Sequence, residues 1–565
     1  MKRTLIPIIS GLLLSAGFVR AEIQIWPAPA ETKITRLETE FDKDSHIWSS
    51  ADPTVRLAAA GGEHALFQVI VSVDRDSLHS VMVEAGGFAA IDGKLPAEAV
   101  RVYLCPQVKV YAPSTEHGKA GWYPDPLVRL GKPVDISPYR WQSHNNQTFL
   151  VEIEVPRGQK AGKYRGEVNV TAAGNSRAKF PVELSVRGFD LPPAFHQYAI
   201  FNCSSGWLRS YYDERRLAGR NLDDVLAAYF DFMLERGIQP WLNPLIQPEY
   251  EETADGLKLS WPLPEQEKHY LSHPAYRRVT FPAAPRELEN RSENEKFTPA
   301  FDRKIRDWVG GIWEHYRQNG WQDKLTFFGP VDEPNSKEAY LELIEWGKLV
   351  KLVSPEVGFQ VTEQPLPQQP DWPSLASVAT DWVVHGTALE SNRAELRRQI
   401  EAGHNACWYI SCDQTWPMAN YFIDEPGVDP RAVPWITYNY GLEGILYWAI
   451  NFWTEVKSPW SDPVTWKSSE CNAPLAGEGS LVYPGEEIES YCGQTDVRGP
   501  VSSLRLELLR KGMEDVEYIY LLAENGQKDE AMRLCMELVI SADTFSRDLA
   551  RYEKVKAEAA RLLGR

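Results

Sequence analysis

The first third of the chain carries the alternation of apolar and polar positions that is typical of short β-strands. Runs with this alternation span residues 65–73, 100–104, 147–155, 164–170 and 180–186. Successive side chains of a strand point to opposite faces, so each run is expected to bury one face and expose the other. Leu191-Pro192-Pro193 then ends the pattern. We therefore predict a β-sandwich domain over residues 22–190.

Beyond residue 195 the pattern changes to short apolar runs that alternate with amphipathic helices. The runs that we interpret as strands span residues 198–203, 240–246, 325–329, 358–362, 382–385, 405–411 and 444–450. Buried strands that alternate with helices form parallel sheets, and seven or eight such units are typical of a (β/α)8 barrel of the TIM type. We predict this barrel over residues 195–523 and expect its missing strand within residues 251–299.

The two ends of the chain show different patterns. Residues 502–523 have helical spacing and are expected to complete the barrel wall, and residues 524–565 predict a small C-terminal helical appendage. Residues 1–21 predict a signal peptide, because Lys2 and Arg3 precede a short apolar run and Val19-Arg20-Ala21 has the small-x-small pattern of a cleavage site. We therefore expect a periplasmic or secreted protein.

Charge and cysteine content narrow the possible partners. The formal net charge of −18 argues against nucleic acid and anionic membranes, while the oligomeric state is not predicted. The seven cysteines show no CxxC spacing and the histidines are scattered, so we expect no metal or other cofactor. Export permits disulfides, and Cys471 with Cys492 is the pair that we expect first.

The strongest candidate for chemistry is the pair Asp332-Glu333. These acids directly follow the apolar run 325–329, and Pro334 ends the segment. In a TIM barrel the active site lies at the carboxyl ends of the strands, and two adjacent carboxylates raise the pKa of at least one of them, as a general acid requires. A surface turn or a helix N-terminus would account for the same residues without chemistry.

The predicted seventh strand, residues 405–411, lacks the glutamate that many barrel glycosidases use as their nucleophile. Asp413, with Asp424 next, is the remaining candidate for a second carboxylate. An adjacent Asp-Glu pair without that glutamate suits substrate-assisted catalysis, in which the 2-acetamido oxygen of the substrate attacks the anomeric carbon.

Aromatic side chains close the last two predicted strands and could form a sugar pocket. Trp408 and Tyr409 end the seventh strand, and Tyr447, Trp448 and Asn451 end the eighth. Flat aromatic faces stack on sugars and shield a cationic intermediate from water. Because alternate residues of a strand point to opposite faces, about half of these aromatics should be core residues instead.

The chain resembles glycoside hydrolase family 123 over most of its mature length. The matching segments are 62–68, 162–166, Asp332-Glu333-Pro334, Trp408-Tyr409, 420–424, Arg431 with Trp435, 444–448, 479–485, 503–505 and 512–515. Each segment alone is a weak match, and together they are fairly specific.

This resemblance implies a β-sandwich followed by a barrel and an exo-acting, retaining β-N-acetylgalactosaminidase that works through an oxazoline. It implies that Asp332 orients the acetamido group and that Glu333 is the acid and base. Asn420 and Asp424 are expected to contact sugar hydroxyls, although a structural role is equally expected. Implied substrates are N-acetylgalactosamine-containing oligosaccharides of glycolipids or glycoproteins.

Two alternatives remain at this point. In the first, Asp413 or Asp424 serves as a protein nucleophile or base on glycans without an acetamido group. In the second, the protein binds glycans without catalysis, which export and the 20 tryptophans would suit.

Overall fold

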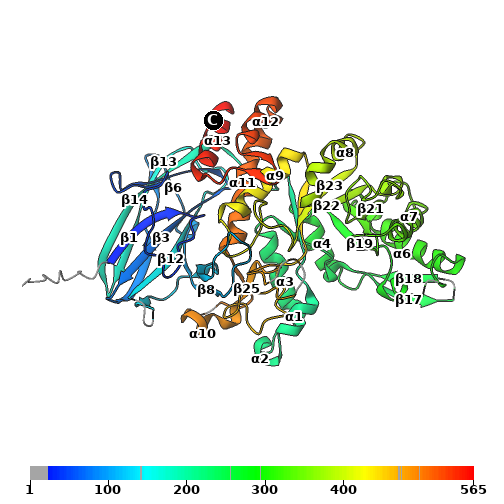
Figure 1. Cartoon of the computed structure of the whole chain (residues 1–565), viewed down its shortest axis with the longest axis horizontal. Helices are drawn as coiled ribbons and strands as arrows, with labels where there is room; N and C mark the ends of the chain where they lie inside the picture. Colours follow the sequence, from blue (N-terminus) through cyan, green and yellow to red (C-terminus); the bar gives the residue numbers. More distant parts are fainter. Residues whose placement is uncertain are drawn as a thin grey trace, which may run out of the picture.

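A computed structural model describes residues 23–139, 143–254, 256–292, 294–468, 471, 474–495 and 497–564. The predicted signal peptide, residues 1–21, lies outside the described residues. Figure 1 shows a β-sheet domain on the left, a barrel on the right, and the C-terminal helices α12 and α13 above them. No helix within the described ranges is long and apolar enough to cross a membrane.

The N-terminal domain consists of two main sheets packed face to face. The first has the order β1 (Ile23–Pro29), β3 (His64–Asp74), β12 (His144–Glu154), β7 (Val100–Cys105) and β10 (Val128–Arg129). The second has the order β11 (Val134–Ile136), β4 (Leu78–Ala85), β13 (Gly162–Ala172), β14 (Asn175–Asp190) and β2 (Val55–Gly61), with β5 (Ala89–Ala90) and β6 (Gly93–Lys94) beside it. The sandwich predicted from the alternating runs is confirmed.

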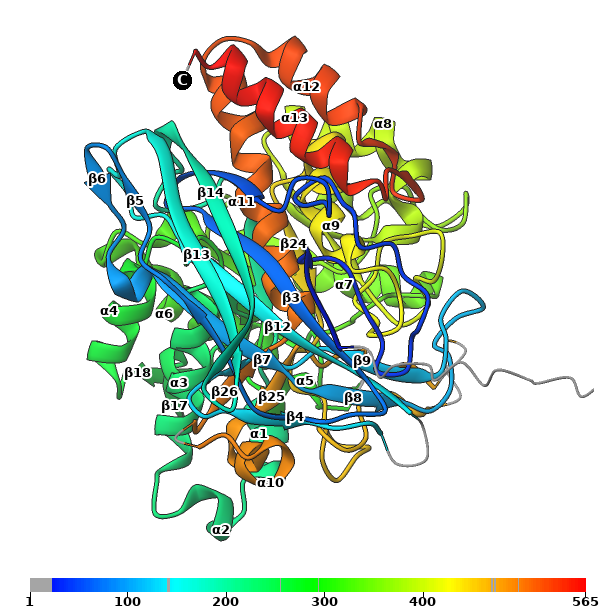
Figure 2. The same cartoon turned by 90° about the vertical axis from the view of Figure 1, so that its left-hand side faces the viewer.

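Both faces of strand β3 are buried, which explains how the sandwich joins the barrel. Phe67, Val69 and Val71 point into the core between the two sheets. The alternate residue Leu66 packs against Leu504 and Leu508 instead. Those leucines belong to helix α11 (Leu504–Glu524), which runs behind the sandwich in Figure 2. The outer face of the first sheet is therefore an interdomain surface.

The second domain contains eight parallel strands in the chain order of a (β/α)8 barrel. They are β15 (Tyr198–Phe201), β16 (Ile238–Pro240), β19 (Val279–Pro282), β20 (Leu325–Phe328), β21 (Gly358–Val361), β22 (Asp381–His385), β23 (Asn405–Ile410) and β24 (Gly444–Tyr447). The strand missing from the sequence pattern is β19, inside the region 251–299. The predicted barrel fold is confirmed.

The hydrogen-bond ladder is interrupted between β16 and β19, and a side chain bridges the gap. Gln239 of β16 accepts hydrogen bonds from the backbone N–H groups of Arg277 and Arg278 at 2.8 and 3.0 Å. Its amide nitrogen donates to the Arg278 carbonyl, and the Tyr276 hydroxyl donates to the Pro240 carbonyl at 3.2 Å. These bonds replace the backbone pairs that the two strands do not make.

Helices and short elements surround the barrel. The helices are α1 (Ser205–Tyr211), α2 (Glu214–Leu217), α3 (Leu222–Leu234), α4 (Pro264–Ser272), α5 (Arg286–Glu289), α6 (Pro299–Gln318), α7 (Lys337–Lys351), α8 (Leu389–Glu401), α9 (Val428–Tyr440), α10 (Ile488–Cys492), α11, α12 (Lys528–Met536) and α13 (Leu549–Leu562). Two-stranded sheets pair β8 (Gln107–Val110) with β9 (Gly121–Pro124), β17 (Glu249–Thr253) with β18 (Gly256–Ser260), β25 (Val482–Pro484) with β26 (Pro500–Ser502), and β27 (Val539–Ser541) with β28 (Thr544–Phe545).

Helix α11 buries charged side chains as well as leucines. Arg505 pairs with Asp125 of the N-terminal domain at 2.8 Å, and Arg510 pairs with Glu152 of β12 at 2.5 Å. Buried charges are tolerated only when they are paired, so the interface between the two domains depends on these specific contacts.

Candidate active site

Asp332 and Glu333 lie at the carboxyl edge of the barrel, directly after β20. Glu333 has a φ of +46°, a left-handed conformation that costs a non-glycine residue about 1–3 kcal/mol. The surrounding contacts must hold it there. Such strained positions are concentrated at functional sites, where they aim a side chain.

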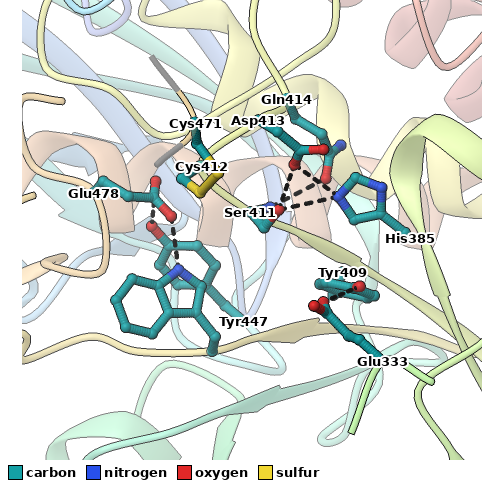
Figure 3. Close-up of a disulfide and its surroundings, with 11 residues drawn as sticks. Glu333, His385, Tyr409, Ser411, Cys412, Asp413, Gln414, Tyr447, Cys471 and Glu478 are labelled. Atoms are coloured by element: carbon teal, nitrogen blue, oxygen red, sulfur yellow. Dashed lines mark hydrogen bonds and ion pairs between the residues drawn. A yellow bond between two sulfur atoms is a disulfide. The ribbon is translucent and has the colours of Figure 1, made fainter. Parts of the chain in front are cut away.

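The hydroxyl of Tyr409, at the end of β23, donates a hydrogen bond to Oε1 of Glu333 (Figure 3). Burial, together with this hydrogen bond, raises the pKa of the Tyr409 hydroxyl, so Tyr409 is a neutral donor at physiological pH. The contact joins the fourth and seventh strands and fixes one carboxylate oxygen of Glu333.

Asp332 is exposed to water and is not among the residues that line the cavity, although protein atoms surround much of its carboxyl group. This partial desolvation raises its pKa, and the neighbouring charge of Glu333 raises it further. A hydrogen bond with Thr362, after β21, opposes the shift. Because their surroundings differ, one of the two adjacent acids can act as a proton donor while the other stabilises positive charge.

A cavity of about 800 Å³ opens above these strands. Its lining residues are Glu333, Asn335, Thr362, Glu363, Gln364, Gln368, His385, Thr387, Ala388, Ser391, Tyr409, Ser411, Cys412, Asp413, Trp448, Trp466 and Cys471. The volume lies within the range of small-molecule sites. Of the predicted site residues, Glu333, Tyr409, Trp448 and the alternative carboxylate Asp413 line it.

Glu363 is a third carboxyl group of the cavity that the sequence interpretation did not single out. It directly follows the predicted strand 358–362, so the rule that identified Asp332 and Glu333 could have found it. Its carboxylate accepts hydrogen bonds from the Gln364 backbone at 2.8 Å and from the Gln368 side chain at 2.7 Å. Glu363 is only 4% exposed, and burial raises its pKa.

Asp413 belongs to a cluster with His385 and Ser411 on the same cavity wall (Figure 3). Nε2 of His385 lies 2.9 Å from Asp413 Oδ1 and 3.0 Å from Ser411 Oγ. The hydrogen bond from His385 lowers the pKa of Asp413 to about 2. Because Asp413 and Ser411 contact the same imidazole nitrogen, the cluster does not form a serine-activating relay. It holds Asp413 as an anion.

The aromatic wall of the cavity is positioned by a buried carboxyl group, Glu478. The indole Nε1 of Trp448 donates to Glu478 Oε1 at 2.6 Å, and the Tyr447 hydroxyl donates to Oε2 at 3.1 Å (Figure 3). The Trp466 ring lies edge-on to Trp448 at 5.4 Å. Burial raises the pKa of Glu478 to about 7.

We expect that replacing Glu478 by Gln removes a pH-dependent cost of folding. The carboxyl pKa rises from 4.5 to about 7 on folding, so the folded state binds more protons than the unfolded chain in this window, and stability falls as pH rises through it. The free energy of unfolding of Glu478→Gln, relative to the parent, should therefore rise between pH 5 and 8 by up to about 3 kcal/mol. Denaturant unfolding at both pH values measures this, with the exposed Glu338→Gln as control. An equal difference at both pH values would contradict it.

Several predicted contact residues lie away from the cavity. The structure does not bring Trp408, Asn420, Asp424, Tyr447 or Asn451 into its lining. Trp408 and Tyr409 alternate along β23, so their side chains point to opposite faces. Trp408 is buried, and its indole donates to Thr437 of α9 at 2.7 Å. Tyr447 is buried, lies edge-on to Trp448 at 6.4 Å and donates a hydrogen bond to Glu478.

The polar residues among them have structural partners. Asn451 exchanges two hydrogen bonds of 3.0 Å with the Ser204 backbone. Asn420 accepts from the Phe422 backbone at 2.9 Å. Asp424 accepts from the Ser114 backbone and hydroxyl at 2.7 and 2.6 Å and lines a separate cavity. These contacts favour structural roles for Asn420, Asp424 and Asn451, and their contact with the sugar stays a prediction.

The expected disulfide between Cys471 and Cys492 is wrong. Cys471 is bonded to Cys412, and both residues line the cavity (Figure 3). Cys492 is a free thiol at the end of α10. The bond ties the loop after β23 to the segment after β24, which the separation of the cysteines along the chain does not reveal.

Within the described ranges, no group of three or more His, Cys, Asp or Glu side chains is arranged to hold a metal ion.

Comparisons with known proteins agree with the fold. Two family models match the chain, glycoside hydrolase 123, catalytic domain, over residues 271–522 and glycoside hydrolase 123 N-terminal domain over residues 34–172. A solved family 123 glycoside hydrolase from Clostridium perfringens, studied for glycolipid glycan hydrolysis, matches with a TM-score of 0.69 at 14% identity, covering 96% of this chain and 98% of that chain.

Other solved structures are more distant. A family 5 xyloglucanase from Bacteroides ovatus has a TM-score of 0.27 at 10% identity over 81% of this chain and 98% of its own. A β-D-glucuronidase from Dictyoglomus thermophilum has a TM-score of 0.29 at 11% identity over 80% of this chain and 68% of its own. No curated protein sequence matches the chain. The two family models together span both domains, and the chain therefore belongs to glycoside hydrolase family 123.

Proposed function

We propose that this glycoside hydrolase is an exo-acting, retaining β-N-acetylgalactosaminidase that uses the 2-acetamido group of its substrate as the nucleophile. The observation that carries the proposal is the placement of Asp332 and Glu333 side by side at the end of β20, with Glu333 lining the cavity and held by Tyr409. The family resemblance supports the choice of sugar.

In the first step, the acetamido carbonyl oxygen attacks C1 of the terminal sugar while the glycosidic C–O bond breaks. Glu333 gives its proton to the leaving oxygen. Asp332 accepts a hydrogen bond from the acetamido N–H, aligns the attacking oxygen, and offsets the positive charge of the oxazolinium that forms.

In the second step, a water molecule attacks C1 from the side that the leaving group vacated, and the bond from C1 to the acetamido oxygen breaks. Glu333, now a carboxylate, takes the proton from this water and is restored as an acid. Two displacements at C1 give net retention of configuration. Trp448 and Trp466 supply apolar surface against which a sugar ring can stack.

A second function has one observation in its favour, because Asp413 also lines the cavity and could act as a protein nucleophile or base on glycans without an acetamido group. The hydrogen bond from His385 that lowers the pKa of Asp413 to about 2 makes it a weak base and a weak nucleophile. Asp424 is held by Ser114 in another cavity. We therefore favour the substrate-assisted route.

We propose that the enzyme acts outside the cytoplasm on N-acetylgalactosamine-terminated oligosaccharides of glycolipids or glycoproteins. The signal-peptide pattern of residues 1–21 supports export, and the net charge of −18 argues against nucleic acid or an anionic membrane as a binding partner. A purely glycan-binding role would not explain the adjacent acids Asp332 and Glu333.

The test is a set of aryl β-glycosides with and without a 2-acetamido group. We expect hydrolysis of the N-acetylgalactosaminide, little hydrolysis of the plain galactoside, and competitive inhibition by a thiazoline analogue of the oxazoline. Comparable rates on the plain galactoside, or a covalent glycosyl-enzyme trapped with a 2-fluoro sugar, would instead support Asp413 as nucleophile. Glycan binding without any turnover would support the binding protein.

A further inference from the structure

The cavity above the barrel is lined by carboxyl groups and, among the described residues, by no Lys or Arg side chain. Glu333, Glu363 and Asp413 line it, and Asp332 adjoins Glu333. Residues 469, 470, 472 and 473, which flank Cys471, are Ser, Glu, Asn and Ala in the sequence. Glu333 carries the proton that it donates in the proposed reaction, so the negative charge that a bound substrate meets comes mainly from Asp413 and from Asp332 beside Glu333.

His385 is the one basic side chain among the described lining residues, and it is engaged by other groups. Its Nε2 atom contacts Asp413 and Ser411, and its Nδ1 atom lies 2.6 Å from the Thr387 hydroxyl. Even a protonated His385 is offset by Asp413, so this cluster adds no net positive charge to the cavity.

Cations on the neighbouring segments are paired with acids outside the lining. Lys337, at the start of α7, contacts Asp371 at 3.2 Å. Arg393 of α8 contacts Glu390 at 3.0 Å. Lys467, next to Trp466, contacts Asp462. A substrate anion would have to break such a pair to gain a counter-charge.

The charge on Asp413 is permanent in the working range of pH, because the hydrogen bond from His385 lowers its pKa to about 2. Its side chain is 48% exposed, so it can act on a group in the cavity. Protein walls screen charge less than bulk water does, and like charges brought together in such a space oppose binding strongly.

We propose that this active site selects uncharged glycan residues and rejects terminal sugars that carry a sulfate or a carboxylate. The inference rests on the proposed N-acetylgalactosaminidase function and specifies its substrate class as neutral oligosaccharides. Asp413 and Asp332 set this preference through their charge, because Glu333 carries the proton that it donates and is uncharged when the substrate binds.

A series of aryl N-acetyl-β-galactosaminides that differ only at O6 tests the proposal. We expect kcat/KM to fall at least about tenfold from the parent to the 6-sulfate and to change much less for the 6-O-methyl ether, which adds bulk without charge. The loss on the 6-sulfate should shrink as ionic strength rises, because salt screens charge. Inhibition by the free sugars should follow the order 6-amino-6-deoxy, parent, 6-sulfate, from tightest to weakest.

The ratio of kcat/KM on the parent substrate to kcat/KM on the 6-sulfate is expected to fall at least about threefold in the variant Asp413→Asn. The matched control is Glu338→Gln, which removes an exposed acid in the first turn of α7 outside the lining and should leave the ratio unchanged. The ratio, rather than either rate, is the readout, because any effect of Asp413 on turnover itself cancels.

Equal kcat/KM on the parent and the 6-sulfate would overturn the inference, and so would rejection of the methyl ether as strongly as the sulfate, since exclusion would then be steric. The failure of the proposed function looks different. In that case neither aryl substrate is hydrolysed, while the dissociation constants of the 6-amino, parent and 6-sulfate sugars, measured by calorimetry, still report the charge preference.

Discussion

Replacing Glu333 by Gln is expected to lower kcat/KM on a 4-nitrophenyl N-acetyl-β-galactosaminide by about 10²–10⁴-fold. The amide has nearly the same shape and can still accept the hydrogen bond from Tyr409, so the left-handed turn at residue 333 should persist. It can neither donate a proton to the leaving oxygen nor take one from water. Steady-state kinetics measures the loss, and an unchanged thermal unfolding midpoint shows that the fold is intact.

The leaving group separates the tasks of Glu333 and Asp332. A 2,4-dinitrophenolate leaves with little help from an acid, so the first step of Glu333→Gln should be far less impaired with this substrate than with a phenyl glycoside. Asp332→Asn should lose activity on both substrates to a similar degree, because aligning the acetamido group does not depend on the leaving group. Full activity of both variants would rule out the proposed roles.

The sequence predicted the architecture well where a single local pattern determines an element. Alternating apolar positions predicted the sandwich because one face of each strand is buried. Strand β19 (Val279–Pro282) escaped although β15, β20, β21 and β24 also have four residues, because it lies in a region that reads as a loop in the sequence. Helix α11 was expected as a barrel wall, and its buried charges such as Arg505 and Arg510 are balanced by partners in the other domain, which no local pattern reports.

Sequence position was enough to predict a site residue where the end of a strand alone determines the location of the side chain. Asp332 and Glu333 follow a strand at the carboxyl edge of the barrel, and that rule would also have found Glu363. The rule failed where the direction of a side chain decides whether it reaches the cavity. Trp408 and Tyr409 are neighbours in sequence, but their side chains point to opposite faces of the strand. No sequence pattern pointed to Glu478. Its role depends on a hydrogen bond with Trp448, which lies 30 residues earlier in the chain.

Arg431→Met is expected to destabilise the folded protein by about 3–5 kcal/mol. The guanidinium of Arg431, on α9, is completely buried and contacts Asp515 of α11 at 2.5 Å, Glu31 of the N-terminal domain at 2.6 Å and Glu553 of α13 at 2.6 Å. Methionine fills similar space but removes the cation that contacts Glu31 and leaves Lys556 as the remaining ion-pair partner of Asp515. The apparent Tm should fall by about 3–4 °C.

The pH dependence identifies the cause of this loss. Burial alone would raise the pKa of Asp515, but the charges of Arg431 and Lys556 hold it below its usual value. A carboxyl pKa that is lowered on folding stabilises the protein above the unfolded pKa near 4, and this contribution disappears as pH falls below it. The difference between Arg431→Met and the parent should therefore be largest above pH 4 and shrink as pH falls below 4, through the lowered pKa of Asp515. The exposed Arg165, which pairs with Glu183 at 3.4 Å, is the matched control, and Arg165→Met should cost less than about 1 kcal/mol. An equally small cost for Arg431→Met would show that the buried ion pairs do not hold the sandwich, the barrel and the C-terminal helices together.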